Sequence, residues 1–254
     1  MLKLEKKSIA QAIFVIGYEK DLSIRKKQFE IEKFFQPLIP TASSNTNLPD
    51  DFNSQAPRVI LSYGAVSAHF SQVSAQMAID VNNEHTTQDM DIAKQIIADA
   101  VMLFQQCLDE VIDRDNQLEQ GLVLTIKYPV DMSAYKDEDI FRYIQSNFIT
   151  LPALGAPASA GLNVGYKTDD NYFINLGISQ YKIVFAQLSP AQEALGLDFS
   201  NFPAQEIGIE LKIDVNSKPQ LNEQRKIKGV TAILLKKAFD FLYNDADNLM
   251  GIKL

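Results

Sequence analysis

Two aspartates stand in identical four-residue stretches of this chain. "IDVN" occurs at Ile79–Asn82 and again at Ile213–Asn216, so Asp80 and Asp214 have the same neighbours. Brought together across a pseudo-twofold axis, the two carboxylates would form a metal site or an acid–base pair. The alternative is structural, because Asp and Asn are common where a strand ends and Asn mimics a turn. The pattern favours the structural interpretation, with Asp80 and Asp214 kept as the candidate metal ligands.

Other residues that could do chemistry are few. The chain has one cysteine, Cys107, and two histidines, His69 and His85, which leaves little for a zinc site. Cys107 lies in the apolar stretch "MLFQQCLDEV" and is expected on a buried helix stripe rather than as a nucleophile. The stretch "GAPASAG" at Gly155–Gly161 lacks the G-K-[ST] that holds a phosphate. We therefore expect neither a catalytic residue set nor a cofactor.

Tyrosine is the other residue type that could bind a partner. Four tyrosines fall in expected strands: Tyr63, Tyr166, Tyr172 and Tyr181. Their side chains either pack on a sheet face, as strand tyrosines commonly do, or form a wettable apolar surface for a peptide or protein. Packing is favoured, and the four remain candidate partner-binding residues.

The elements that would position these residues follow from apolar periodicity and turn residues. In the first half we expect a strand at 12–18, a helix near 23–35, two strands within 58–81 and a long helix at 89–112. The long helix is expected to bury a stripe of Ile92, Ile96, Ala100, Leu103 and Cys107. In the second half we expect a strand at 121–129, a helix at 136–148, two or three strands within 162–188, a strand at 206–215 and a final helix within 225–249.

The two halves share a second pattern. "IGYEKDLS" at Ile16–Ser23 and "IKYPVDMS" at Ile126–Ser133 both read I-x-Y-x-x-D-[LM]-S, and Asp21 and Asp131 are expected as acids near helix starts. Both this match and the "IDVN" match fall in the same order at equivalent elements. The sequence predicts an α+β protein of two related halves, 1–118 (β-α-β-β-α) and 119–254 (β-α-β-β-β-α), each a mostly antiparallel sheet packed by helices. A ferredoxin-like arrangement, in which 121–129 continues the first half as its next strand, is the alternative.

Composition narrows the classes of function. The net charge of −8 and the pI of about 4.9 disfavour nonspecific nucleic-acid binding. The first residues lack the long apolar region of a signal peptide and no stretch predicts a membrane span, so a cytoplasmic protein is expected. Three loops, 36–57, 150–161 and 188–204, are long enough to be either functional or only mobile.

Two features suggest a resemblance to a known family: the stretch "ELKIDVN" at Glu210–Asn216, and the order of elements along nearly the whole chain. They resemble an uncharacterised, sporadically distributed bacterial family with two β-α-β-β-α halves. The outline of sheet plus long helix in each half is similar to the SecB-type export chaperone fold. The resemblance implies no activity that could be transferred to particular residues.

The sequence therefore favours binding over catalysis. The first hypothesis is a non-enzymatic cytoplasmic protein-binding module, chaperone-like or antitoxin-like, whose partner is another protein or a second copy and which binds along an exposed sheet or edge. The second is a carboxylate- or metal-dependent enzyme that uses Asp80 and Asp214. A third is a structural subunit of a larger assembly.

Overall fold

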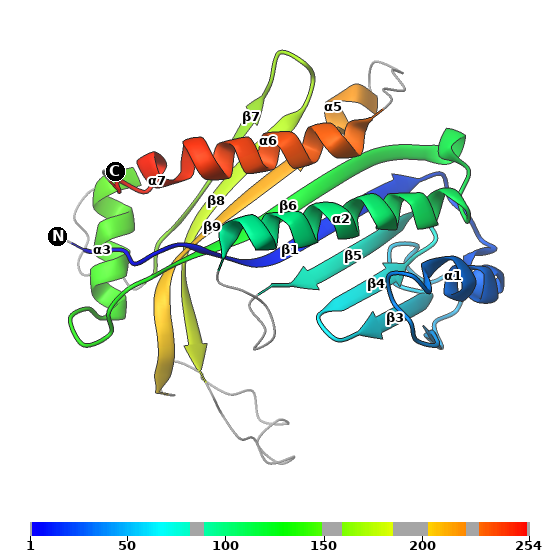
Figure 1. The fold of residues 1–254 in the computed structure, drawn as a ribbon, viewed down its shortest axis with the longest axis horizontal. Helices are drawn as coiled ribbons and strands as arrows, with labels where there is room; N and C mark the ends of the chain where they lie inside the picture. Colours follow the sequence, from blue (N-terminus) through cyan, green and yellow to red (C-terminus); the bar gives the residue numbers. More distant parts are fainter. Residues whose placement is uncertain (1, 82–88, 149–158, 185–202, 222–228, 253–254) are drawn as a thin grey trace. The chain divides into compact units, whose positions relative to one another are not determined.

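A computed structural model describes residues 2–81, 89–148, 159–184, 203–221 and 229–252. These residues form a mixed α+β structure, as the sequence predicts, around a nine-stranded antiparallel sheet (Figure 1). The strand order is β2-β3-β4-β5-β1-β6-β9-β8-β7. The strands are β1 (Ser8–Tyr18), β2 (Ser44–Asn45), β3 (Val59–Tyr63), β4 (Val66–Phe70), β5 (Ser74–Asp80), β6 (Gln117–Pro129), β7 (Gly161–Lys167), β8 (Phe173–Val184) and β9 (Ala204–Asn216).

The helices are interspersed between these strands. The α-helices are α1 (Gln28–Phe35), α2 (Met90–Asp109), α3 (Asp137–Phe148), α5 (Lys218–Leu221), α6 (Val230–Asn244) and α7 (Ala246–Leu249), and two short 3-10 helices are η1 (Ile24–Lys27) and η2 (Arg114–Asn116). The first half has two strands more than expected, because β2 forms within the expected loop 36–57 and the segment 68–81 forms two strands instead of one. The Ser71 hydroxyl accepts the backbone N–H groups of Val73 (3.2 Å) and Ser74 (2.9 Å), which turns the chain without glycine or proline.

The chain divides into two compact units. The larger unit contains Ser8–Thr125, Gly165–Asn175 and Lys212–Leu254, and the smaller unit contains Met1–Lys7, Ile126–Val164 and Leu176–Leu211. These bounds differ from the expected halves 1–118 and 119–254, because strands such as β6 and β9 begin in one unit and end in the other.

Aromatic rings fill the core of the larger unit between the sheet and its helices. Phe104 of α2 contacts Phe14 of β1 with ring centroids 5.9 Å apart and Phe35 of α1 at 5.3 Å. Phe35 also meets Phe70 of β4 edge to face at 4.9 Å. All four rings are at most 1% exposed. Edge-to-face packing of this kind adds about 0.5–1.5 kcal/mol per pair to the burial of the rings.

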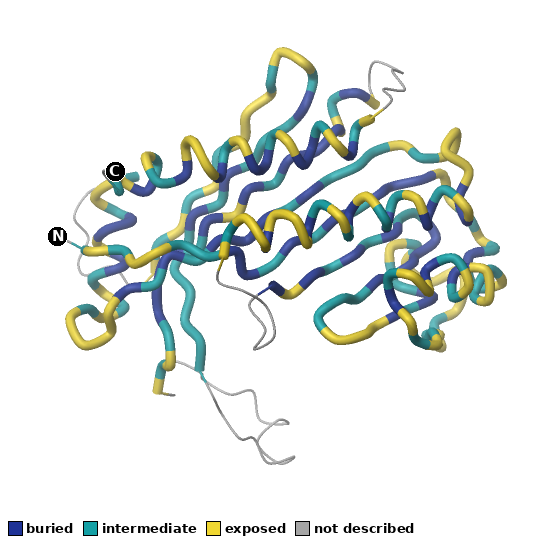
Figure 2. The backbone as a smooth tube through the Cα atoms, viewed as in Figure 1, coloured by how far each residue is buried: buried dark blue, intermediate teal, exposed yellow. Residues whose placement is uncertain are grey.

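Helix α2 buries a different stripe from the one expected. Its start is fixed by Asp89, whose carboxylate accepts the N–H groups of Asp91 (2.9 Å) and Ile92 (3.3 Å). Cys107 is buried as expected, but Ile92 is 51% exposed and Ile96 is 39% exposed, so the expected stripe is wrong at these two residues. The sheet instead receives the bulkier set of Ala93, Ile97, Val101, Phe104 and Leu108, as Figure 2 shows along the helix.

Helices α2 and α6 lie side by side and run in opposite directions over one face of the larger unit's strands (Figure 1). At one end the Tyr243 hydroxyl of α6 donates to the Asp91 carboxylate at 2.8 Å. At the other end the Thr231 hydroxyl donates to the side-chain oxygen of Gln105 at 3.2 Å. Contacts at both ends therefore set the position of α6 along α2.

In the smaller unit the sheet makes one very close backbone approach. A Cβ added at Gly208 of β9 would lie 2.3 Å from the Tyr128 carbonyl oxygen and 2.8 Å from the ring of Tyr181. Real Cβ atoms do not come this close to a backbone oxygen, so this position requires glycine. Tyr128 itself is fully buried, and Gln180 of β8 donates to Asp137 at the start of α3 at 2.7 Å.

Arg58 holds the long segment 36–57 at its C-terminal end. Its side chain is fully buried, and its guanidinium donates to the carbonyl oxygens of Ala56 (2.9 Å), Pro49 (3.2 Å) and Phe52 (3.2 Å). Residues 36–57 thus have a defined backbone path. Most of the other two long loops, 150–161 and 188–204, lies outside the described residues, as do His85 and Asn82.

Candidate functional site

The structure places the repeated aspartates on different strands. Asp80 is the exposed last residue of β5 and Asp214 lies in β9, with β1 and β6 between those strands. Three inter-strand steps of about 4.8 Å separate them by roughly 14 Å, which one ion cannot bridge. The Asp214 carboxylate instead accepts the side-chain amides of Asn175 and Asn216, each at 3.2 Å. The two candidate metal ligands are not brought together.

The remaining reactive side chains are also dispersed. Across the ranges that the structure describes, no three His, Cys, Asp or Glu residues gather closely enough to hold a metal ion. Cys107 is buried, and burial raises the pKa of its thiol, with the neighbouring Glu110 carboxylate acting in the same direction. His69 lies half-buried in β4.

The four tyrosines have different surroundings. Tyr63 in β3 is 59% exposed and Tyr166 in β7 is 52% exposed, so both are accessible to a partner. Tyr172 is 1% exposed and lies under the Lys237 ammonium, 5.2 Å from its ring centroid. The Tyr172 ring therefore packs inside the larger unit and is not exposed to a partner.

Tyr181 in β8 is half-buried in the smaller unit. Burial raises the pKa of its hydroxyl well above the usual value, and the carboxylates of Glu206, Glu5 and Glu210 raise it further. The Lys127 ammonium lies 5.1 Å from its ring centroid. Packing against charged neighbours occupies this side chain more than exposure to a partner does.

No helix of the described residues covers one face of four neighbouring strands. In β1, β3, β4 and β5, alternate residues point to the side on which α1 and α2 lie (Figure 1), and the residues between them point to the other side. We call the residues on the other side the open sheet face: Gln11, Ile13, Val15, Gly17, Ile60, Ser62, Ser67, His69, Ser74, Gln76, Ala78 and Asp80.

The register places these side chains in rows across the strands. One row runs Ile60, His69, Gln76, Val15, and the next runs Ser62, Ser67, Ala78, Ile13. Asp80 is the only charged residue of the open sheet face, and it lies at the end of β5 opposite Gln11. Antiparallel strands that face water normally carry polar and charged side chains, whereas the centres of protein interfaces are depleted of charge. The open sheet face thus combines uncharged polar side chains with the apolar side chains of Ile13, Val15, Ile60 and Ala78.

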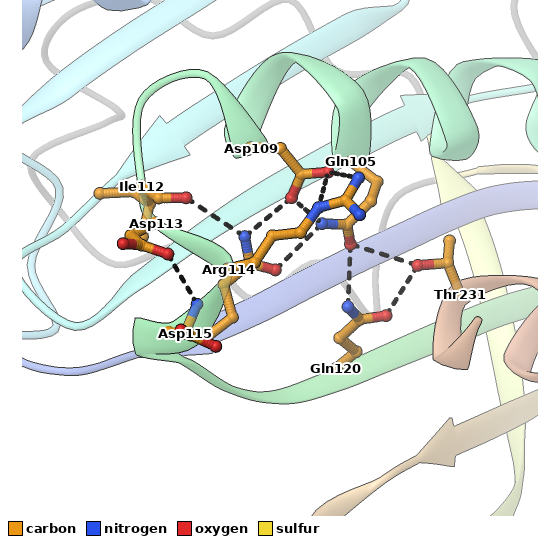
Figure 3. A network of polar contacts seen from close by, with 9 residues as sticks. Gln105, Asp109, Ile112, Asp113, Arg114, Asp115, Gln120 and Thr231 are labelled. Atoms are coloured by element: carbon orange, nitrogen blue, oxygen red, sulfur yellow. Dashed lines mark hydrogen bonds and ion pairs between the residues drawn. The ribbon is translucent and has the colours of Figure 1, made fainter. Parts of the chain in front are cut away.

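A second feature is a network of glutamines between α2, β6 and α6 (Figure 3). The amide of Gln105 donates to Asp109 (2.7 Å) and to Gln117 (3.0 Å), while the amide of Gln120 donates to the Gln105 oxygen (2.8 Å). The Thr231 hydroxyl closes the network with bonds to the oxygens of Gln120 (2.8 Å) and Gln105 (3.2 Å). These bonds fix the side chains that form one wall of a pocket.

The pocket has a volume of about 530 Å³, within the range of small-molecule sites. We call it the glutamine pocket; it is lined by Met102, Gln105, Arg114, Asp115, Gln117, Leu118, Glu119, Gln120, Ser217, Gln220, Gly229, Val230, Thr231 and Ala232. Its lining comes from two stretches of the larger unit far apart in the chain. Sequence reasoning missed it, since glutamines in a helix and at a strand start carry no motif.

Comparison of the chain with protein-family models, with curated proteins and with solved structures finds no match. None of the helices in the described part of the chain is both long and apolar enough to cross a membrane.

Proposed function

We propose that the protein is a non-enzymatic binding module that holds a polypeptide partner on the open sheet face. The observation that carries this proposal is the composition of that face. Ile13 and Val15 of β1 and Ala78 of β5 are half-buried on that face, and neither of the two rows contains a charged residue. Burying such side chains against a partner is favourable at about 25 cal/mol per Å² of apolar surface, and no buried charge opposes it.

Charge indicates the chemistry of the partner. Two acids border this surface: Asp80 at the end of β5, and Glu119 of β6, whose side chain lies over Gly17. The whole chain carries a net charge of −8. We infer a partner segment that is apolar at its centre and basic on its flanks, because basic flanks would meet the acidic rim and speed association.

The same proposal includes the internal duplication. The order β3-β4-β5-β1 is followed in the sheet by β6-β9-β8-β7, so each half places its first strand beside its last. Both turns after the first strand are alike: Asp21 accepts the Ser23 N–H at 2.7 Å and its hydroxyl at 2.6 Å, and Asp131 accepts those of Ser133 at 2.8 and 2.7 Å. Ile79 and Asp80 of the first "IDVN" stretch end β5, and the second stretch ends β9. These likenesses support two copies of one module.

Peptide binding tests the proposed function. Fluorescently labelled peptides with one apolar centre, flanked by lysines or by glutamates, are titrated with the protein and followed by anisotropy. The lysine-flanked peptide is expected to bind more tightly than its glutamate-flanked counterpart, and more weakly at high salt. Ala78→Lys, which places a charge at the centre of the face, is expected to abolish binding, while Gln95→Lys on the exposed side of α2 leaves it unchanged.

Equal binding of both peptides, or full binding by Ala78→Lys, would refute the proposal. Sedimentation of the protein alone tests whether the partner is a second copy of this chain. A concentration-dependent dimer that Ala78→Lys dissociates would assign the open sheet face to self-association instead. The number of different peptides that bind distinguishes a chaperone-like from an antitoxin-like protein, since the former binds many apolar segments and the latter binds one.

A further inference from the structure

The glutamine pocket is bordered by the first turn of α6. The residue before the helix, Gly229, has a left-handed backbone (φ 79°), and no side chain of the described residues caps the helix start. Val230, Thr231 and Ala232 line the pocket, and first-turn N–H groups have no partner within their own helix. α6 is 15 residues long, so its positive end is well developed and favours negative charge.

An independent observation at the same pocket is the side chain of Gln220. It is 4% exposed and lines the pocket, yet its amide nitrogen has no hydrogen-bond partner among the residues that the structure describes. A buried amide without a partner lowers stability, and natural proteins keep few of them. This donor is explained if a ligand supplies the acceptor.

The acceptors near the helix start are already used. The Gln105 oxygen accepts from both Gln120 and Thr231, and the Gln120 oxygen accepts from Thr231. Of the two acids in the lining, Glu119 leaves β6 on the face opposite to Gln120 and lies over Gly17, and Asp115 is exposed at the rim. Among the described residues, the part of the pocket at α6 thus presents donors and no carboxylate.

The opposite wall is apolar. Met102 of α2 is 39% exposed and Leu118 of β6 is 48% exposed, and both line the pocket. We propose that the glutamine pocket binds a small organic oxyanion with an apolar body. Its phosphate or carboxylate accepts from the first turn of α6 and from the Gln220 amide, and its apolar part covers Met102 and Leu118. This inference is independent of the open sheet face.

Four probes test the pocket: hexyl phosphate, hexanoate, inorganic phosphate and hexanol, titrated into the ¹⁵N-labelled protein. We expect saturable shifts of the Thr231 and Ala232 backbone amides and of the Gln220 side-chain amide with at least one of the two amphiphilic anions. That anion should bind more tightly than inorganic phosphate, and hexanol should bind least. The better of the two identifies the oxyanion. Absence of saturable shifts with both anions, or hexanol binding as tightly as they do, overturns the inference.

Gln220→Leu tests whether the side-chain amide of Gln220 binds a ligand or stabilises the fold. Because the substitution removes a buried donor without a partner, it is expected to raise the melting temperature while it weakens anion binding by about tenfold. Gln106→Leu, exposed on α2 and outside the pocket, should change neither. A lower melting temperature with unchanged binding would show that the amide serves the fold.

Leu118→Ser tests the apolar wall without touching a buried residue. It should weaken binding of the hexyl compound and leave inorganic phosphate unchanged. Equal loss for both ligands, or no loss for either, would contradict the proposed orientation of the ligand.

Discussion

Arg58 is the residue whose replacement tests the packing of the larger unit most sharply. Its buried guanidinium binds the carbonyl oxygens of Ala56, Pro49 and Phe52, and no carboxylate among the described residues pairs with it. Arg58→Met keeps the apolar stem and removes every donor. The segment 49–57 then loses the group that holds its carbonyls together.

The size of the effect follows from two opposing terms. Hydrogen bonds from a charged donor contribute about 1.5–3 kcal/mol each, and three are made at 2.9–3.2 Å. Removing a buried charge recovers part of its desolvation cost, and carbonyls near the surface can turn to water. The net expectation is a loss of about 2–4 kcal/mol in the free energy of unfolding, within the range of large single-residue effects. The free energy of unfolding of Arg58→Lys should lie between those of the wild type and Arg58→Met, because a single ammonium cannot match the forked geometry of the guanidinium.

Urea unfolding gives the global value, and amide hydrogen exchange gives the local one. The amides of Phe52, Ala56 and Gln72, which bond within or to this segment, should lose protection first. Lys26→Met, a cation-to-methionine change at an exposed site, is the matched control and should leave the free energy unchanged. Unchanged protection of these amides in Arg58→Met, or a loss below about 1 kcal/mol, would refute the role assigned to Arg58.

Three further predictions concern single residues. Gly208→Ala should destabilise the protein by about 3 kcal/mol or prevent folding, measured by thermal unfolding, because its Cβ would meet the Tyr128 carbonyl oxygen at 2.3 Å; near-normal stability would contradict the close approach. Phe104→Ala should cost about 3–5 kcal/mol through the cavity left among three rings, whereas a loss near 1 kcal/mol would mean that the rings repack. For Asp21, burial raises the pKa, but hydrogen bonds from Ser23 and Lys27 outweigh burial and hold the pKa below its usual value. The contribution of the Asp21 carboxylate to the free energy of unfolding is therefore present above about pH 4 and lost as the pH falls through the folded-state pKa. The difference in this free energy between wild type and Asp21→Ala should shrink in acid, and an increase would contradict the prediction.

Much of the fold could be predicted because periodicity is a local signal. The expected strands at 12–18 and 206–215 correspond to β1 and β9, and the final helix lies within the predicted 225–249. The break within 68–81 was missed because the Ser71 side chain makes the turn, and serine is a weaker turn signal than glycine or proline. The α2 stripe was shifted because two apolar stripes compete on one helix, and only packing against the sheet decides between them.

The candidate sites were harder to predict because they are made of residues without chemical motifs. The open sheet face exists only once the register aligns Ile13 with Ala78 and Ala78 with Ser67. The glutamine pocket joins α2 and the start of β6 to the start of α6, more than a hundred residues later in the chain. Neither Gln220 nor Gln105 differs in sequence from an ordinary surface glutamine, and only burial and missing or completed hydrogen bonds distinguish them.

The most direct test of the proposed binding surface is an NMR titration of the ¹⁵N-labelled protein with the lysine-flanked apolar peptide. Backbone amide shifts are predicted to concentrate at Ile13, Val15, Ser67, Gln76 and Ala78, across β1, β4 and β5. Shifts that instead follow Ile92 and Ile96 on the exposed side of α2, or no shifts at saturating peptide, would contradict it.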